Sequence, residues 1–438
     1  MLNVGITMTI PSNDIRNEAT PIIKSVITWV SILVLFLVKI EGFAPVISWR
    51  HHQTQNMIIG PWATTTTTTA LSNSAPAPFS EGERNDVSTI VNDTTDIKST
   101  SATQSVPRTT RQTFPNTETV QRHYQTFPWN YQGEHFDINY RVEGPTNGPP
   151  ILLIHGFGAN LNHFRYQFPV LTEAGYRVHA LDLLGFGASP KPGHVQYSME
   201  LYVQLVTDFI QSRRNKSQPR SSFRRRNIPP SWIVAGNSIG GLICLGVAAQ
   251  LPDTVRGVIL FNCSGGMTGF RYSDVPMWAR PILWFFQKIL LGPHVGSSFF
   301  SRFKTRANIE SILRHQGVYR NQTNVDDELL EILLRPAEDD GAETVFLKTF
   351  AGDPGPTPEE ILPNLQCPVL AVWGGDDPWT PVDSGMHPGT KFSDYCEDFE
   401  LHTIPNCGHC PHDEAPDVVN ALILSWMTNI NSRQRTAR

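Results

Sequence analysis

The chain has 438 residues, 40% of them hydrophobic, and a formal net charge of -5 at pH 7. This length is enough for one large or two ordinary domains with a substantial core. The near-neutral charge gives no electrostatic basis for a nucleic-acid partner. The cysteines are too few and too scattered for a disulfide framework, and they leave the redox compartment open.

Residues 1–42 have the features of a signal peptide. Residues 26–38 form a mostly apolar run that follows Lys24 and is too short to span a bilayer comfortably. The sequence Phe-Ala-Pro follows Gly42, and this junction resembles the bipartite plastid-targeting presequence of diatoms and related algae, in which Ala usually stands in place of the glycine. The resemblance implies a plastid (chloroplast) protein. An uncleaved membrane anchor is the alternative.

The chain from about residue 60 to 118 is polar and rich in Thr, Ser, Asn and Pro. Such a segment buries too little apolar surface to offset the entropy that ordering costs. We expect residues 43–118 to be a plastid transit segment and a disordered linker. The folded domain is expected at 119–433, and residues 434–438 are expected to be a tail.

From about residue 124, short apolar runs alternate with longer amphipathic ones, which is typical of an α/β fold. Both faces of the strands would then be covered, which favours a mostly parallel central sheet. Helices are expected at residues 199–212 and 240–250. Strands are expected at 136–142, 151–154, 177–180, 232–235, 257–261, 369–372 and 400–404.

Two segments interrupt this alternation. Residues 212–231 are basic and contain Ser and Pro, which favours a solvated loop, with attraction to anionic lipid as the alternative. Residues from about 264 to 349 form an insertion between two strands and contain an aromatic cluster that includes Trp278, Trp284 and Phe285. These side chains would be ordinary helix packing or, if the insertion is a helical lid, would line a substrate pocket.

The strongest motif is Gly-x-Ser-x-Gly at residues 236–240, between an apolar strand and an apolar helix. This is the arrangement of a nucleophile elbow, a turn that exposes the hydroxyl of Ser238. The backbone N–H of Ile239, at the start of the helix, would face a developing oxyanion. The earlier strand at 151–154 also ends in a glycine-rich turn, and the backbone N–H of Phe157 would be the second oxyanion donor.

A serine nucleophile needs a base, and the base needs an acid that sets its tautomer. After Ser238, this architecture places the acid and then the histidine along the chain. The strand at 369–372 is followed by Asp376 and Asp377, both candidates for the acid. His409 follows the strand at 400–404 and a glycine, whereas His412 lies beyond a proline, so His409 is the expected base.

Cys407-Gly-His-Cys410 also matches a dithiol motif and, with His412, a metal-binding pattern. A dithiol oxidoreductase would carry the motif early in a small domain, opening a helix. Zinc would have to share His409 with the catalytic arrangement. We therefore interpret the segment as the carrier of the base and expect no metal and no organic cofactor. A disulfide between Cys407 and Cys410 that perturbs His409 is a further hypothesis.

Residues from about 124 to 430 resemble the α/β-hydrolase superfamily and, more narrowly, the plant and algal pheophytinases. The resemblance rests on Gly-Asn-Ser-Ile-Gly-Gly at 236–241, Trp-Gly-x-x-Asp-Pro-Trp at 373–379 and Gly-His-Cys-Pro-His-Asp-Glu at 408–414. It implies an α/β-hydrolase fold with an inserted helical lid, and Asp377 as the acid. It also implies a serine carboxylic-ester hydrolase that removes phytol from chlorophyll or pheophytin, giving chlorophyllide or pheophorbide.

The expected partner is thus a small molecule, a phytylated tetrapyrrole, and a plastid enzyme of this kind would make peripheral contact with the thylakoid membrane. Whether the ring contains magnesium stays open. Three alternatives remain: a carbon–carbon bond hydrolase acting on ring-cleavage products, which shares the Gly-Asn-Ser elbow, a general lipase or esterase, and a non-catalytic pigment-binding or ligand-binding protein of the same fold.

Overall fold

The computed structural model describes residues 124–216, 231–267, 277, 280–281, 284, 293–350, 352–385 and 387–436. The expected signal peptide, transit segment and linker lie outside these residues, as does most of the basic segment at 212–231. None of the helices in the described ranges combines the length and the apolar character that crossing a membrane requires.

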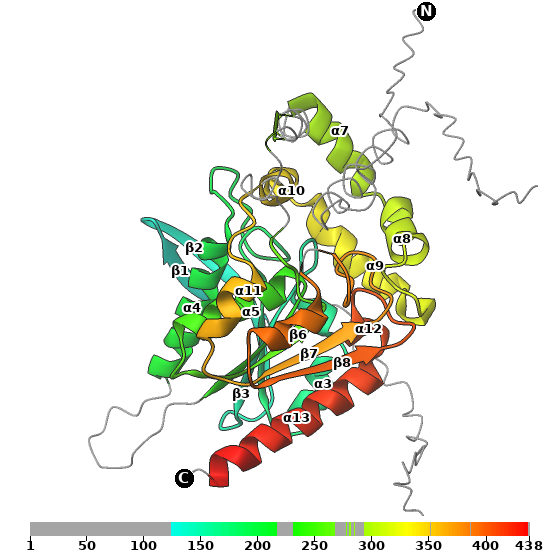
Figure 1. Ribbon diagram of the computed structural model, residues 1–438. Helices are drawn as coiled ribbons and strands as arrows, with labels where there is room; N and C mark the ends of the chain where they lie inside the picture. Colours follow the sequence, from blue (N-terminus) through cyan, green and yellow to red (C-terminus); the bar gives the residue numbers. More distant parts are fainter. Residues whose placement is uncertain are drawn as a thin grey trace, which may run out of the picture. The chain divides into compact units, whose positions relative to one another are not determined.

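A central eight-stranded sheet has the strand order β1-β2-β4-β3-β5-β6-β7-β8 (Figure 1). The pairs β1/β2 and β2/β4 are antiparallel, and all the others are parallel. This confirms the α/β fold with a mostly parallel sheet. The strands are β1 (Tyr124–Tyr131), β2 (Glu134–Glu143), β3 (Pro150–Ile154), β4 (Arg177–Leu181), β5 (Trp232–Asn237), β6 (Val255–Phe261), β7 (Val369–Gly374) and β8 (Phe399–Ile404).

The seven expected strands are all present, with ends that differ by at most two residues, and β1 is an additional strand. The sequence of β1 is YQTFPWNY, and its Pro128 argues against a central strand, because proline lacks the N–H that a ladder needs. β1 lies at the edge of the sheet, where that loss is tolerated. Pro128 therefore explains why these residues were not expected to form a strand, and the edge position explains why they form one nonetheless.

The side chains of β3 show how helices cover both faces of the sheet. Leu152 and Ile154 pack with residues of α4 (Met199–Lys216) and α5 (Ile239–Gln250). Ile151 and Leu153 pack instead with residues of α3 (Gln167–Glu173) and α13 (Pro416–Thr436). Figure 1 shows these two helices together on one side of the sheet. Because successive side chains in a strand alternate between faces, a continuous apolar run fits a strand buried on both sides. Each such side chain contributes roughly 1.5–3 kcal/mol by burial.

The chain between β6 and β7 is helical in the part that the structure describes. Helices α8 and α9 begin at side-chain caps: Thr305 accepts a hydrogen bond from the N–H of Asn308, and Asp326 accepts one from Leu329. From residue 293 on, the helices here are α7 (Pro293–Phe303), α8 (Arg306–His315), η2 (Gln322–Asn324), α9 (Asp327–Leu334), η3 (Arg335–Glu338), α10 (Ala342–Phe350), α11 (Pro358–Ile361) and η4 (Leu362–Asn364). The remaining short helices are η1 (Leu161–Phe164), η5 (Gly389–Asp394) and α12 (Pro411–Glu414).

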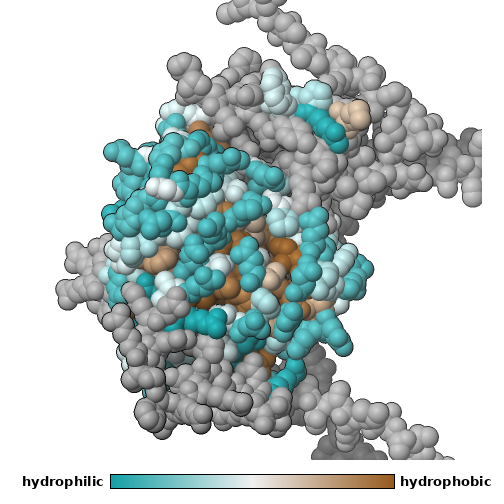
Figure 2. All heavy atoms as spheres, turned by 90° about the vertical axis from the view of Figure 1, so that its left-hand side faces the viewer, coloured by the Kyte–Doolittle hydropathy of each residue, from teal (hydrophilic) through white to brown (hydrophobic). Residues whose placement is uncertain are grey.

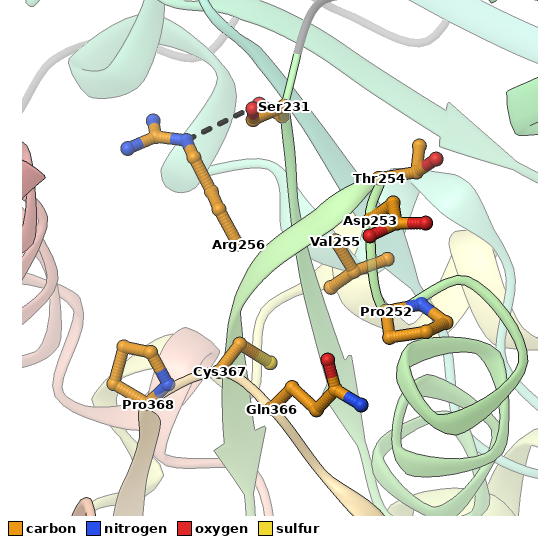
Figure 3. A pocket seen from close by; sticks show the side chains of 9 residues that line it. All are labelled: Ser231, Pro252, Asp253, Thr254, Val255, Arg256, Gln366, Cys367 and Pro368. Carbon is orange, nitrogen blue, oxygen red and sulfur yellow. Dashed lines mark hydrogen bonds between the residues drawn. The ribbon is translucent and has the colours of Figure 1, made fainter.

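The two ends of the parallel strands differ in what they offer to a ligand. A hollow of about 220 Å³ lies where β5, β6 and β7 begin, lined by residues such as Arg256 and Cys367 (Figure 3). The Arg256 guanidinium turns toward Ser231 and donates to its carbonyl oxygen at 3.2 Å. Ligands of open α/β sheets bind instead at the carboxyl ends of the strands.

The face over β1, β2 and α4 is mostly hydrophilic, with a smaller hydrophobic area near its centre (Figure 2).

Candidate active site

Ser238 stands between β5 and α5 in a backbone conformation that side chains rarely adopt. Its φ is 55° and its ψ is -121°. The turn is this tight because Gly236 and Gly240 allow close approach: a Cβ on Gly236 would lie 2.3 Å from the Gly240 backbone, and one on Gly240 would lie 2.2 Å from the Ile154 carbonyl oxygen. Backbone strain of this kind costs roughly 1–3 kcal/mol and persists mainly at functional sites.

The turn after β3 packs directly against this elbow. A Cβ on Gly156 would lie 3.3 Å from the Cβ of Ser238 and 3.0 Å from the Asn237 side chain. Phe157 follows Gly156 along the chain, and Ile239 follows Ser238 as the first residue of α5. The turn that carries Phe157 therefore lies against the elbow, and Ile239 adjoins Ser238 along the chain.

His409 and Asp377 form a buried pair. The Nδ1 atom of His409 lies 2.7 Å from Oδ2 of Asp377, and the two side chains are 4% and 0% exposed. Although burial alone raises it, the pKa of the Asp377 carboxyl is about 2, because His409, Thr380 and Asn262 stabilise the anion. A carboxylate at Nδ1 favours the tautomer that leaves Nε2 as a proton acceptor. Asp376 is exposed.

Asn237 joins the loop of His409 to the elbow. Its Nδ2 donates to the carbonyl oxygens of Phe261 and His409, both at 3.1 Å. The residue before the serine is thus bonded to the backbone of the histidine. Ser238 and His409 lie on neighbouring segments although 171 positions separate them in the sequence (409 − 238 = 171).

The sequence analysis assigned no role to three residues around Asp377. Asn262 donates to Asp377 at 2.6 Å and accepts from the Gly374 N–H at 2.9 Å. The Thr380 hydroxyl also donates to Asp377. The Trp379 ring, 42% exposed, lies 4.9 Å from the His409 ring. Asn262 is the first residue after β6, so a search for polar residues at strand carboxyl ends would have found it.

Among the described residues, phenylalanine side chains pack around the expected oxyanion turn. Trp284 is 54% exposed, and Trp278 and Phe285 lie outside the described residues. The Phe157 ring instead lies 4.9 Å from Phe346 of α10. We call the group around it the phenylalanine cluster, which consists of Phe157, Phe186, Phe299, Phe300, Phe303, Phe346 and Phe350. Phe346 and Phe350 are spaced to share one face of α10, a signal that the sequence did carry.

The cysteines near His409 do not form a disulfide in this structure. Cys407 and Cys410 are free and buried, and burial raises the pKa of both thiols above the ordinary value. Redox and metal chemistry both need the thiolate, which these surroundings disfavour. Among the residues that the structure describes, no group of three or more His, Cys, Asp or Glu side chains is arranged to hold a metal ion.

Comparison with known proteins gives a consistent family. The model of the alpha/beta hydrolase family matches residues 151–422. A 2-hydroxy-6-oxo-6-(2'-aminophenyl)hexa-2,4-dienoic acid hydrolase of Metapseudomonas resinovorans is 27% identical, over 64% of this chain and 84% of its own length. A chloroplastic pheophytinase of Arabidopsis thaliana is 26% identical, over 67% of this chain and 65% of its own. The crystal structure of a serine hydrolase involved in carbazole degradation (CarC enzyme) has a TM-score of 0.50 at 24% identity, covering 70% of this chain and 99% of its own, which supports the fold alone.

Proposed function

The chain belongs to the alpha/beta hydrolase family, and from this premise we propose that it hydrolyses a carboxylic ester with Ser238, His409 and Asp377. The observation that carries the proposal is the buried hydrogen bond between His409 and Asp377, in a loop that Asn237 joins to the strained elbow. A nucleophile, a base and an orienting acid are the three groups that acyl transfer needs.

The mechanism follows from the tautomer of His409. Its Nε2 accepts the proton of the Ser238 hydroxyl while Oγ attacks the ester carbonyl carbon, and Asp377 stabilises the imidazolium that forms. The backbone N–H groups of Phe157 and Ile239 donate to the oxyanion of the tetrahedral intermediate, each contributing roughly 3 kcal/mol. The imidazolium then protonates the departing alcohol. Water, deprotonated by the same nitrogen, releases the acid and restores the serine.

For the substrate we propose the phytyl ester of chlorophyll or pheophytin, which would give phytol and chlorophyllide or pheophorbide. Three features support this: the likeness to the pheophytinase, the Cys-Pro-His-Asp-Glu segment at 410–414, and the phenylalanine cluster beside the expected oxyanion turn. An apolar aromatic wall suits a long isoprenoid alcohol, because the hydrophobic contribution grows with the apolar area buried.

A second candidate is hydrolysis of a carbon–carbon bond in a ring-cleavage product. The relative from Metapseudomonas resinovorans is named for such a compound, as is a 2-hydroxy-6-oxo-6-phenylhexa-2,4-dienoate hydrolase of Burkholderia cepacia, 26% identical over 66% of this chain. The identity to the Burkholderia cepacia enzyme equals that to the pheophytinase, so an assay decides between the two substrates.

The deciding experiment supplies the purified full chain separately with chlorophyll a, pheophytin a, a 2-hydroxy-6-oxo-hexadienoate and a short-chain nitrophenyl ester. The Ser238→Ala variant is the control, expected to lose at least about 10³-fold in rate. Ser238-dependent release of phytol is the expected result. Turnover of the dienoate alone would replace the dephytylase proposal by the second candidate, and turnover of the nitrophenyl ester alone would leave a general esterase. If a fluorophosphonate also fails to label Ser238, the protein is a non-catalytic binder.

We further propose a plastid location with peripheral contact to the thylakoid membrane. The support is the presequence-like segment at 1–42 and the phytylated substrate, which resides in that membrane. A fluorescent protein fused to the C-terminus of the full chain should coincide with plastid autofluorescence in a diatom cell. Fluorescence confined to the secretory pathway would contradict the location, and the same fusion recovered only in the soluble plastid fraction would contradict the membrane contact.

A further inference from the structure

One buried carboxylate joins the insertion between β6 and β7 to the loop that carries His409. Glu414 is 1% exposed, and its Oε2 accepts a hydrogen bond from the N–H of Gly408 at 2.7 Å. Its Oε1 accepts from the N–H groups of Arg320 and Asn321 at 2.8 and 2.6 Å. The residue before the histidine and a turn of the insertion therefore share a single side chain.

The two segments also touch through their backbones. The N–H of His409 donates to the carbonyl oxygen of Val318 at 2.8 Å. A Cβ on Gly408 would lie 2.2 Å from that same oxygen, so the close contact requires glycine before the histidine. Residues 317–321 of the insertion thus fix the backbone of both Gly408 and His409.

The neighbouring carboxylate, Asp413, extends this contact to η1. Arg165, the residue after η1, donates to Asp413 from Nε at 2.7 Å and from Nη2 at 3.2 Å, and both side chains are fully buried. Tyr319 of the insertion donates its hydroxyl hydrogen to Asp413 at 3.0 Å. Arg165 also donates to Asp326 at 2.7 Å, so its charge is shared by carboxylates from two segments.

Burial of this much charge needs a reason. A buried ion pair rarely adds net stability compared with apolar side chains of similar volume, because both charges lose their hydration. Burial alone lowers the pKa of Arg165, but the contact with Asp413 raises it above the ordinary value, so the guanidinium stays charged. A directional network that ends on the backbone of the histidine loop fixes geometry, which apolar packing does less strictly.

We propose that Glu414 and Asp413 are positioning residues, which hold the His409 ring in line with Ser238 by fixing residues 407–414 to residues 317–326 of the insertion. This inference rests on the proposed role of His409 as the base. It makes this part of the insertion a component of the catalytic framework. The reason it matters is quantitative: a displacement of about 1 Å in a catalytic group can cost on the order of 10²-fold in rate.

The test separates position from folding by labelling Ser238 with a fluorophosphonate in the full chain. The amplitude of labelling reports the fraction of molecules that are folded, and the rate constant reports activation of the serine by His409. For Glu414→Gln, which keeps the shape but replaces one acceptor by a donor, we expect a rate constant roughly 10- to 100-fold lower at full amplitude. With an ester that the wild type hydrolyses as substrate, kcat should fall by the same factor while KM changes little.

The matched control is Glu400→Gln, an exposed glutamate of β8 paired only with His402 in the described structure, and it should label like the wild type. A Glu414→Gln protein with lower amplitude and an unchanged rate constant would overturn the proposal, since a purely structural residue behaves that way. If Glu414→Gln does not fold, Tyr319→Phe tests the proposal instead. We expect its labelling rate constant to fall roughly 3-fold, and an unchanged rate constant would overturn the proposal. A wild-type protein that is not labelled would instead refute the proposed function, and this inference with it.

Discussion

The insertion between β6 and β7 is attached to the sheet in two different ways. Around residues 317–326 the contacts are hydrogen bonds and an ion pair to three buried residues, Arg165, Asp413 and Glu414. Around α7 and α10 the contacts are aromatic, with Phe346 at the centre and its ring 4.9 Å from that of Phe157. The first attachment is directional and depends on charge, whereas the second depends on volume and tolerates rearrangement.

This difference separates two tasks of the site. The polar attachment ends on the backbone of the proposed base, whose position has to be fixed before a substrate arrives. The aromatic attachment adjoins the proposed oxyanion turn, where an apolar substrate would be accommodated. Four predictions test whether the polar attachment depends on charge and the aromatic attachment on volume, beginning with the largest effect.

The largest expected effect is on the charged side. Asp413→Asn leaves the buried guanidinium of Arg165 without its fully buried partner, and we expect a loss of about 3 kcal/mol in the free energy of unfolding. Urea unfolding measures it. The control is Asp327→Asn, which removes an exposed carboxylate paired with Arg306 and should cost less than about 1 kcal/mol. Equal losses in the two variants would show that burial of the pair has no special importance.

The next effect concerns pH. The Asp377 carboxyl has its pKa lowered from 3.8 to about 2, so its interactions stabilise the folded protein above the unfolded-state value by about 2 kcal/mol. This contribution is complete above about pH 4 and is lost as the pH falls through about 2. Urea midpoints of the wild type and Asp377→Asn should therefore differ by a constant amount above about pH 4 and converge below it. A difference that widens in acid would contradict the assignment.

On the aromatic side we expect a smaller effect without pH dependence. Phe346→Leu removes the ring contacts with Phe157 and Phe303 but keeps an apolar side chain, at a cost of about 1 kcal/mol. The cost should be the same at neutral pH and below about pH 4, where the contribution of Asp377 is lost, because no charge is involved. If it changes with pH as that of Asp377→Asn does, the two attachments are not separate.

The last prediction is that a reductant has no effect on the rate. Cys407 and Cys410 lie in the polar loop, but both are free and buried, and the raised pKa of each thiol disfavours the reactive thiolate. Preincubation with dithiothreitol should leave the rate of Ser238-dependent turnover unchanged. A change of more than about 2-fold would revive the hypothesis of a regulatory disulfide between these cysteines.

Local signals in the sequence were sufficient for the sheet and for the residues at the ends of its strands. Continuous apolar runs mark β3 and β5 because both faces of these strands are covered, and the glycines at 236 and 240 mark the elbow because no other residue fits there. Ser238, Asp377 and His409 follow strand ends, so they were expected at one edge of a parallel sheet, and the choice of Asp377 over Asp376 came from the resemblance. The antiparallel edge strand β1 was not predicted, because Pro128 argues against a strand at this position.

The contacts that surround these residues could not be predicted, because they join segments far apart in the chain. Nothing near Arg165 in the sequence indicates that its partner is Asp413, 248 residues away. Asn262 could be found as a polar residue at the end of β6, but its contact with Asp377 depends on the pairing of β6 with β7. The pocket prediction of Trp278, Trp284 and Phe285 followed the density of aromatic residues and stays a prediction, since two of the three lie outside the described residues. The rings that contact Phe157 depend on how α10 packs.

The ion pair between Arg165 and Asp413 also has a consequence for biosynthesis. Arg165 is translated 248 residues before Asp413. Until residues 413 and 414 have left the ribosome, the guanidinium lacks its fully buried partner, and residues 317–326 lack the carboxylate acceptors that fix them. The nucleophile elbow can therefore form early, but the proposed base is held in place only after residues 409–414 have been made, so a chain that stops before them carries the serine without the means to activate it.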